Sequence, residues 1–352
     1  MKVLMIGVSR KTKGGMWTVV ENYLSDKNFV KSCKLKYIPS ATCGNAIKRA
    51  LFSTMAILRI FIYNLFHKYD VLHVHMSERA SVSRKGVVIS ISKALRHPKV
   101  IIHMHGAEFE QWYKNLSRRK QDKVLKIINR ADKIIILGEY WRDFIGSLLI
   151  DSGKIHVIHN GVAVPENNPY NKQAKNILFL GEIGKRKGIY ILLNAIQQIN
   201  GRMENFKVIL CGNDTTPGIN EEIEKRNLTA RVVYYGFLDN DHRKQVFKET
   251  AINVLPSFNE GLPMTVLETM AFGIPNIATN VAAIPEVVNA KNGALIEPND
   301  KKALASTILK MLTDDNLRLA QSEKAYSTIR QNFSIRTHNH SILNIYKEVL
   351  HV

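Results

Sequence analysis

Two glutamates separated by seven residues, Glu260 and Glu268, are the part of this sequence best suited to chemistry. The apolar run at residues 251–255 predicts a buried parallel strand, and a helix is expected to begin near Met264. Glu260 would then lie at the carboxyl end of a strand, the edge where open α/β sheets bind ligands. The amides of Gly261 and Leu262 would lie at a helix N-terminus, which favours an anion such as phosphate. Carboxylates beside an anion site suit a nucleotide sugar, although two glutamates on a surface helix are also commonly just solvated charges.

A second cluster, Lys185-Arg186-Lys187, is positive and lies some seventy positions earlier in the chain. It occupies a glycine-flanked turn between a predicted strand at 176–181 and a predicted helix at 188–199. Lysine supplies a mobile point charge and arginine supplies planar paired donors, so the turn suits a diphosphate. The same triplet also occurs on ordinary protein surfaces.

Histidines alternate along two further predicted strands, at residues 71–76 and 100–106. Alternation places His103 and His105 on one face, where they could form a metal pair. Neither a cysteine nor an acidic partner nearby completes such a site, so no metal is expected, and hydrogen-bonded core histidines are the favoured interpretation. His105 stands out because it precedes Gly106 at a strand's carboxyl end, where it could hydrogen-bond to a sugar hydroxyl.

Several glycines end strands and allow a close approach of backbone to a ligand. Gly14 and Gly15 follow the first strand, but no G-x-G-x-x-G fingerprint is present. Gly212 and Gly236, the latter followed by Phe237 and Leu238, end two strands of the second half. At each of these places a plain turn is an equally good interpretation.

The elements that must position these residues alternate strand and helix throughout, which predicts the α/β class with two doubly wound Rossmann-like domains. We expect an N-terminal domain at residues 1–165, a polar linker and a C-terminal domain at 173–333. The apolar stretch 46–69 contains Arg59 and falls short of a spanning helix. A buried core helix is the favoured interpretation, with an interfacial helix as the alternative.

The charge of the chain is lopsided. Of the formal net charge of +20, residues 1–150 carry +17, from 27 Lys+Arg against 10 Asp+Glu, and residues 151–352 carry +3, from 23 against 20. A basic first half could attract nucleic acid or an anionic membrane surface, or could serve solubility alone. The three cysteines have no metal-type spacing and are expected to be reduced thiols of a cytosolic protein.

Together these motifs resemble the signature of the family 4 retaining glycosyltransferases of the GT-B fold, of the kind found in bacterial capsule and exopolysaccharide synthesis. The resemblance rests on Pro-Ser-x-x-Glu-Gly-Leu-Pro at 256–263, the Glu260-x7-Glu268 spacing, Lys187-Gly188 and His105-Gly106. It departs at Glu182, which stands where the family often has arginine, so the arginine role is assigned to Arg186. The resemblance also implies that two domains face each other across a cleft and that a C-terminal helix, 335–352, packs back on the first domain.

The resemblance implies transfer of a hexose from a nucleoside diphosphate sugar, UDP preferred, to a glycan or lipid-linked oligosaccharide, with neither cofactor nor metal. Catalytic roles would fall to Glu260, His105, Arg186 and Lys187. Donor binding would fall to Glu268, Gly261, Leu262, Gly212, Gly236, Phe237 and Leu238, and the acceptor side to Gly14 and Gly15. The enzyme would be cytoplasmic or peripheral on the inner membrane face. The alternatives are a nucleotide-sugar epimerase of the same fold and a basic nucleic-acid-binding protein, although no specific nucleic acid is expected because its basic regions lack a recognisable binding motif.

Overall fold

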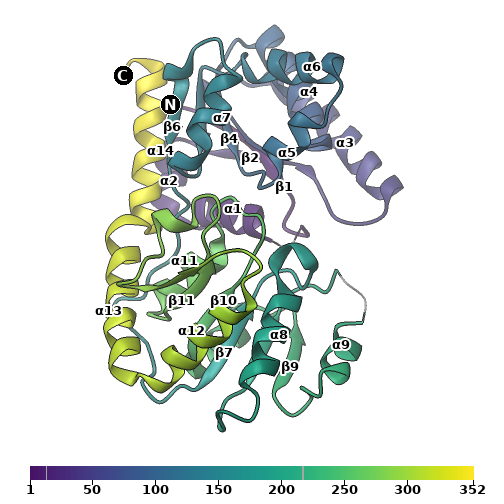
Figure 1. The fold of residues 1–352 in the computed structure, drawn as a ribbon. Helices are drawn as coiled ribbons and strands as arrows, with labels where there is room; N and C mark the ends of the chain where they lie inside the picture. Colours follow the sequence, from purple (N-terminus) through teal and green to yellow (C-terminus); the bar gives the residue numbers. More distant parts are fainter. Residues whose placement is uncertain (13, 216–217) are drawn as a thin grey trace. The chain divides into compact units, whose positions relative to one another are not determined.

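The computed structural model describes residues 1–12, 14–215 and 218–352. The chain divides into two compact units (Figure 1). The N-terminal unit comprises Met1–Gly161 and Ile335–Val352, and the C-terminal unit comprises Val162–Ser334. Each unit is an α/β layer structure around a parallel sheet, so the predicted fold class is confirmed.

The N-terminal unit contains a six-stranded parallel sheet in the order β2-β1-β3-β4-β5-β6. Its C-terminal helix packs within this unit, where Asn339 Nδ2 donates to Asp26 Oδ2 at 2.8 Å. The elements are β1 (Val3–Val8), α1 (Gly15–Ser25), α2 (Lys27–Ser32), β2 (Lys36–Ala41), α3 (Ala46–Phe66), β3 (Val71–Met76), α4 (Ala80–Leu95), β4 (Lys99–Met104), α5 (Phe109–Lys114), α6 (Arg118–Ile128), β5 (Lys133–Ile136), η1 (Glu139–Trp141), α7 (Arg142–Ser147), η2 (Ser152–Lys154), β6 (Ile155–Val157) and α14 (Ile335–Leu350).

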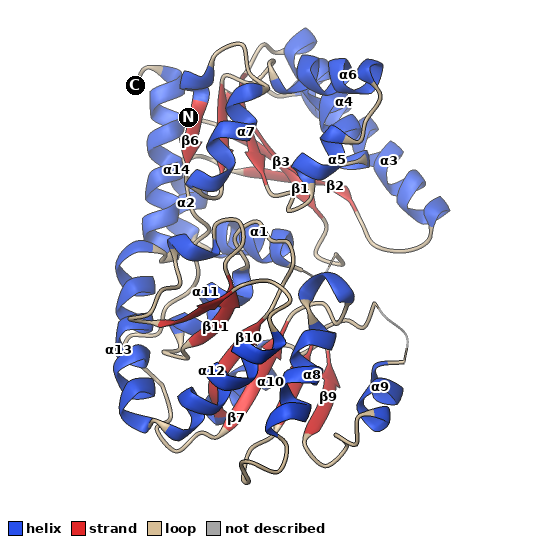
Figure 2. Cartoon of the chain, viewed as in Figure 1, coloured by secondary structure: helices blue, strands red, loops and turns tan. Residues whose placement is uncertain are grey.

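The C-terminal unit contains a second six-stranded parallel sheet, in the order β12-β11-β10-β7-β8-β9. Figure 2 shows helices flanking the strands in each unit. The elements are β7 (Asn176–Leu180), η3 (Lys185–Lys187), α8 (Ile189–Ile199), β8 (Val208–Cys211), α9 (Ile219–Lys225), β9 (Val232–Gly236), α10 (Asn240–Glu249), β10 (Thr250–Leu255), α11 (Met264–Ala271), β11 (Asn276–Thr279), η4 (Ile284–Glu286), β12 (Gly293–Ile296), α12 (Lys301–Thr313) and α13 (Asp315–Asn332).

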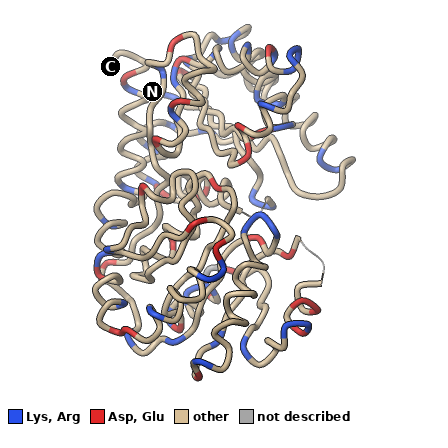
Figure 3. The backbone as a smooth tube through the Cα atoms, viewed as in Figure 1, with Lys and Arg blue, Asp and Glu red and all other residues tan. Residues whose placement is uncertain are grey.

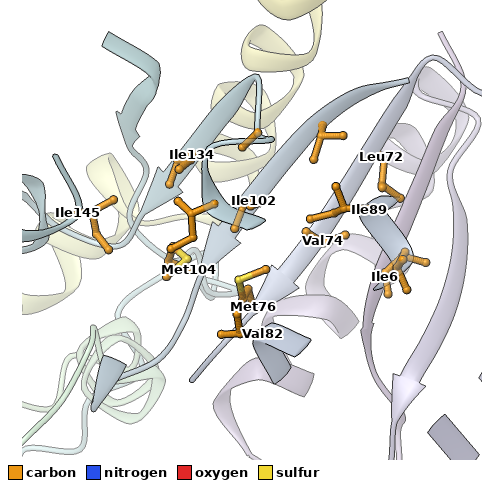
Figure 4. Close-up of a cluster of buried hydrophobic side chains, with 14 of the residues drawn as sticks. Ile6, Leu72, Val74, Met76, Val82, Ile89, Ile102, Met104, Ile134 and Ile145 are labelled. Carbon is orange, nitrogen blue, oxygen red and sulfur yellow. The ribbon is translucent and has the colours of Figure 1, made fainter. Parts of the chain in front are cut away.

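The strands form because their apolar side chains are covered on both faces of the sheet. In the N-terminal unit one face carries a cluster that includes Leu72, Val74 and Met76 of β3 and Ile102 of β4 (Figure 4). Because side chains alternate along a strand, the intervening His73, His75 and His103 are directed to the opposite face. The period-two pattern therefore separates an apolar core from a layer of histidines.

Two expectations about helices are wrong. From their sequence alone, residues 111–130 are expected to form one helix. The structure instead has two helices, α5 and α6, because Ser117 adopts an extended conformation as the N-cap of α6. The preference for α3 as a buried core helix is also contradicted. Only 17% of its most apolar window is buried, and only Ala56, Ile60 and Asn64 lie in the interior. Periodicity identified the helix, but its degree of burial depends on how much of it the neighbouring elements cover.

Candidate functional site

The topology of the C-terminal sheet brings the two predicted charged clusters together. The neighbouring strands β7 and β10 lie at the point where the strand order reverses, so the loops at their carboxyl ends flank the same crevice. The loop after β7 carries Lys185, Arg186 and Lys187, and the loop after β10 carries Glu260. Both clusters therefore belong to one site within this unit.

The contact between the clusters is an ion pair from Lys187 to Glu260. Lys187 Nζ lies 2.5 Å from Glu260 Oε1, and the same oxygen accepts a hydrogen bond from Ser257 Oγ at 2.7 Å. The Glu260 side chain is 5% exposed and that of Lys187 is 12% exposed. In such a shielded position the pair fixes the direction of the carboxylate, because moving either charge away would leave its partner desolvated.

Two hydrogen bonds to backbone carbonyls hold the two loops together beside this pair. Phe258 N donates to Arg186 O at 2.8 Å, and Arg186 Nη1 donates to Asn259 O at 3.0 Å. The Arg186 guanidinium also lies 3.7 Å from Glu182, so the two residues that compete for the family's arginine position form an ion pair with each other. Arg186 is thereby held beside Lys187 at the sheet edge.

Gly188 allows the two loops to approach, and substituting it is expected to destabilise this unit. Its φ is +75°, and a Cβ there would lie 1.9 Å from Pro256 O. We expect Gly188→Ala to cost about 2–5 kcal/mol of unfolding free energy, from backbone strain plus overlap.

Gly201→Ala is the matched control. Gly201 has φ +88°, and among the described residues no atom lies within 4 Å of the added carbon. Gly201→Ala should lower the free energy of unfolding by only about 1–2 kcal/mol. Urea unfolding of both variants measures the difference, and equal losses would contradict it.

Glu268 lies on α11 and is held by an arginine that sequence reasoning missed. Arg243 Nη1, from α10, donates to Glu268 Oε2 at 2.9 Å. Burial raises the pKa of Glu268, and the Arg243 charge and hydrogen bond oppose that rise. The helix begins at Met264 as predicted, and the buried Gly261 and Leu262 immediately precede its Pro263 cap. No motif marks Arg243, which becomes relevant only through this contact.

The remaining predicted donor residues lie at the carboxyl ends of β8 and β9. Gly212 has φ +151°, and a Cβ there would lie 1.6 Å from Gly181 O, so only glycine fits between these strand ends. Gly236 ends β9 with φ +71°. Phe237 is 46% exposed, whereas Leu238 is half-buried against a small apolar cluster. Gly212 therefore has a structural reason to be glycine that is independent of any ligand.

His105 lies just beyond β4 in the N-terminal unit and is tied to other histidines. Its Nε2 lies 2.8 Å from His75 Nδ1, and its ring centroid lies 4.2 Å from that of His103, with the two rings tilted by 34°. Burial, assisted by the positive charges of His338 and Lys85, lowers the pKa of His105 to about 3. At neutral pH this imidazole is uncharged, so it can exchange hydrogen bonds with a hydroxyl but cannot supply a cation.

The histidine layer contains three candidate metal ligands. One nitrogen each of His73, His75 and His103 lies within 4.8 Å of the others. Four of their nitrogens have no hydrogen-bond partner among the described residues: His73 Nε2, His75 Nε2 and both ring nitrogens of His103. Their rings are near parallel, however, with interplanar angles of 18° to 31°. Imidazole binds a metal with an in-plane lone pair, so stacked rings do not converge on one ion. The arrangement favours packed neutral imidazoles, and the expected absence of a metal stays a prediction.

The acceptor-side prediction falls on a loop that the structure describes except at residue 13. Gly14 has φ +138° and precedes α1, whose first residue is Gly15. Two residues at the same sheet edge were missed. Lys85 is buried, donates to Ser40 Oγ at 2.8 Å, and has its pKa lowered to about 7 by burial. Glu78 follows β3, and its buried Oε2 has no partner among the described residues. Its place directly after a strand is the signal that could have identified it.

Comparisons with known proteins agree with this geometry. Residues 34–164 match the family described as Glycosyltransferase Family 4, and residues 163–328 match Glycosyl transferases group 1. An uncharacterised 41.2 kDa protein in the cps region of Klebsiella pneumoniae is 28% identical over 309 residues, 81% of this chain and 83% of that protein. The O-antigen chain mannosyltransferase B of Escherichia coli is 30% identical over 177 residues, 48% of this chain and 45% of that protein. The structure of Anabaena HepE in complex with UDP-glucose has the same fold, with a TM-score of 0.79 over 99% of this chain and 100% of that one at 17% identity.

Proposed function

The chain belongs to the family 4 glycosyltransferases of the GT-B fold, and we propose that it transfers a hexose from a UDP-sugar to a hydroxyl of a glycan acceptor, with retention at the anomeric carbon. The observation that carries this proposal is the contact between Lys187 and Glu260 at the switch point of the C-terminal sheet. It places a carboxylate suited to sugar hydroxyls beside cations suited to a diphosphate.

In the proposed reaction, the bond between the anomeric carbon and the diphosphate breaks, and negative charge develops on the departing diphosphate. The acceptor hydroxyl oxygen bonds to the anomeric carbon, and its proton passes to the departing diphosphate. Arg186, Lys187 and the Gly261 and Leu262 amides stabilise that charge, and this interaction strengthens as the bond breaks. Glu260 positions the sugar through its hydroxyls and forms no covalent bond to it. Because these cations neutralise the leaving group, we propose that the reaction needs no metal, and chelation with EDTA should leave the rate unchanged.

Glu268 completes the donor site in this proposal. Arg243 holds its Oε2, which directs the carboxylate toward the ribose hydroxyls of the nucleotide. His105, in the N-terminal unit, hydrogen-bonds to a hydroxyl of the transferred sugar as an uncharged imidazole.

We propose a lipid-linked oligosaccharide as the acceptor, in the assembly of a cell-envelope polysaccharide by a cytoplasmic enzyme that is peripheral on the inner face of the membrane. The relative in a cps region and the relative named as an O-antigen mannosyltransferase support this acceptor class. The charge of +17 on residues 1–150 supports an enzyme that works next to anionic lipid.

A panel of nucleotide sugars tests the proposal, first by thermal shift and then by transfer onto lipid-linked acceptors. At a hundredfold excess over Kd, a UDP-sugar should stabilise the protein by about 2.7 kcal/mol, a Tm increase of about 5 °C. Glu268→Gln should reduce this shift, because the neutral amide is a weaker acceptor for ribose hydroxyls. Glu249→Gln, a change at an exposed glutamate of the same unit, should leave it intact. Sugar released or isomerised without any acceptor would indicate an epimerase instead.

A further inference from the structure

Helix α3 presents a continuous apolar stripe to the outside of the N-terminal unit. Ile47, Leu51, Met55, Leu58 and Ile62 follow one another at spacings of four, four, three and four residues, which places them on one face of the helix. Phe61, Leu65 and Phe66 extend the stripe at its C-terminal end. The exposed fractions of these eight side chains range from 41% to 76%. A contiguous exposed apolar surface of this kind marks an interaction site.

The opposite face of α3 is fixed to the protein, so the stripe is a permanent feature of the folded chain. Ala56 and Ile60 are buried where the helix packs against β2 and α4. Asn64 Oδ1 accepts a hydrogen bond from Tyr69 OH at 2.7 Å. The Arg96 guanidinium, beyond α4, donates to the backbone carbonyls of Asn64 and Leu65. These contacts give the Asn64 and Leu65 carbonyls, two of the groups left unpaired at the end of the helix, hydrogen-bond donors from the protein itself.

The charges around the stripe are all of one sign. Residues 27–69 contain eight Lys+Arg and no Asp or Glu. Lys48 and Arg59 lie eleven residues apart, about three turns, so both flank the stripe on the same side. Figure 3 shows only positive residues along this helix. An apolar face bordered by lysine and arginine complements an anionic lipid surface, where headgroups meet the cations and acyl chains meet the stripe.

The length of α3 raises the question of whether it spans a membrane. Its 21 residues extend about 31 Å, and among the described residues it is the one helix that is both long and apolar enough to do so. Its connections argue against spanning. The helix links β2 and β3, which both pair with β1 in one parallel sheet, and its inner face is covered by the protein. A helix covered along one face can lie in the plane of a bilayer surface but cannot be surrounded by lipid.

We propose that α3 docks the N-terminal unit on an anionic lipid bilayer, with the stripe of eight apolar side chains inserted below the headgroups and Lys48 and Arg59 among them. A second copy of this chain is a poorer occupant, because the same one-sign charge would face itself across the contact. The proposal specifies the element that makes the membrane contact and does not depend on which sugar or acceptor the enzyme uses.

Flotation of the full-length protein with lipid vesicles tests the proposal. The protein should float with phosphatidylcholine vesicles that contain phosphatidylglycerol, and much less with phosphatidylcholine alone. Leu51→Ser combined with Leu58→Ser and Ile62→Ser should lower the partition coefficient at least tenfold. Lys48→Ala combined with Arg59→Ala should lower it about tenfold at 0.1 M salt, and have little effect at about 1 M, where the Debye length is about 3 Å.

A matched single substitution separates the stripe from exposed apolar surface in general. Ile150 lies elsewhere in the same unit, and its side chain is 92% exposed. The Ile150→Ser variant should float with vesicles as the wild type does. Leu58→Ser, at a residue that is 56% exposed, should already float less. Equal flotation of the triple variant and the wild type would overturn the proposal, as would the absence of binding to anionic vesicles at low salt. A dimer in gel filtration that the triple variant abolishes, without vesicle binding, would assign the stripe to a protein contact instead.

Nucleotide binding distinguishes a failure here from a failure of the proposed transferase activity. The α3 variants should unfold at the same urea midpoint as the wild type and keep the thermal shift with UDP, because the predicted donor residues lie in the other unit. A protein that floats but binds no nucleotide sugar would keep the docking proposal and remove the proposed function. A protein that binds UDP but never floats with vesicles would remove the docking proposal and keep the proposed function.

Discussion

Replacing Glu260 with glutamine is expected to lower the rate of sugar transfer at least about 100-fold while leaving the protein folded. The carboxylate is fixed by Lys187 and Ser257, so in our proposal it presents one defined set of acceptor atoms to the sugar hydroxyls. Glutamine keeps the size of the side chain but replaces one carboxylate oxygen with a donor group. The sugar is then held less accurately relative to the acceptor hydroxyl. Initial rates with a UDP-sugar and a lipid-linked acceptor measure the effect.

Glutamine is a better choice than alanine at this position, for a reason that comes from the structure. Glu260→Ala would leave the Lys187 ammonium, which is 12% exposed, without its partner, and a partly buried unpaired charge is destabilising. The sequence alone predicts lost activity with intact folding for the alanine variant. Glu249→Gln, at an exposed position of the same unit, serves as the control and should transfer sugar normally. Near-normal turnover of a folded Glu260→Gln protein would contradict the assignment.

A second large effect is expected from acidification, which should destabilise the N-terminal unit below about pH 6.5. Burial lowers the pKa of His73 to about 3, that of His105 to about 3 and that of His338 to about 4. Burial also lowers the pKa of His75 and of His103 well below the usual range. Because the unfolded chain takes up these protons near pH 6.5 and the folded chain does so only at much lower pH, stability falls as pH falls through the range around 6.5. Each histidine contributes about 1.4 kcal/mol of loss between pH 7.5 and 5.5.

Urea midpoints at pH 7.5 and 5.5 measure this effect, and the difference between them is the informative quantity. His338→Gln should make that difference smaller, because it removes a buried imidazole that bonds to Tyr23 OH and His159 O. His340→Gln changes an exposed histidine two positions further along α14 and should leave the difference as in the wild type. A midpoint that does not move between the two pH values would show that the histidine layer relaxes to admit protons or water.

Much of the fold could be predicted because its signals are local. Each buried parallel strand is a short apolar run closed by a turn, so residues 71–76 were placed with the bounds that the structure has. The start of α11 followed from Pro263, which the structure uses as its cap. The same alternation that marked β4 as a strand put His103 and His105 on one face, and their ring centroids do lie 4.2 Å apart.

The predictions failed where the outcome depended on a distant partner. The apolar pattern of α3 is equally compatible with burial in a core and with exposure, and only the packing of β2 and α4 shows how little of it is covered. Arg243 belongs to no recognisable motif. It contacts Glu268 only because the fold brings α10 beside α11. The histidine layer likewise includes His338, which lies 235 positions after His103 in the sequence.

The sequence by itself determined the class of this protein, the strand ends that carry its polar groups and the residue types available there. Only the tertiary structure decided which of those groups meet. Lys187 reaches Glu260 because β7 and β10 are adjacent in the sheet, and strand order is a property of the whole unit that no local period encodes. The exposed side of α3 was decided in the same way, because a helix face becomes interior or surface according to what packs on it.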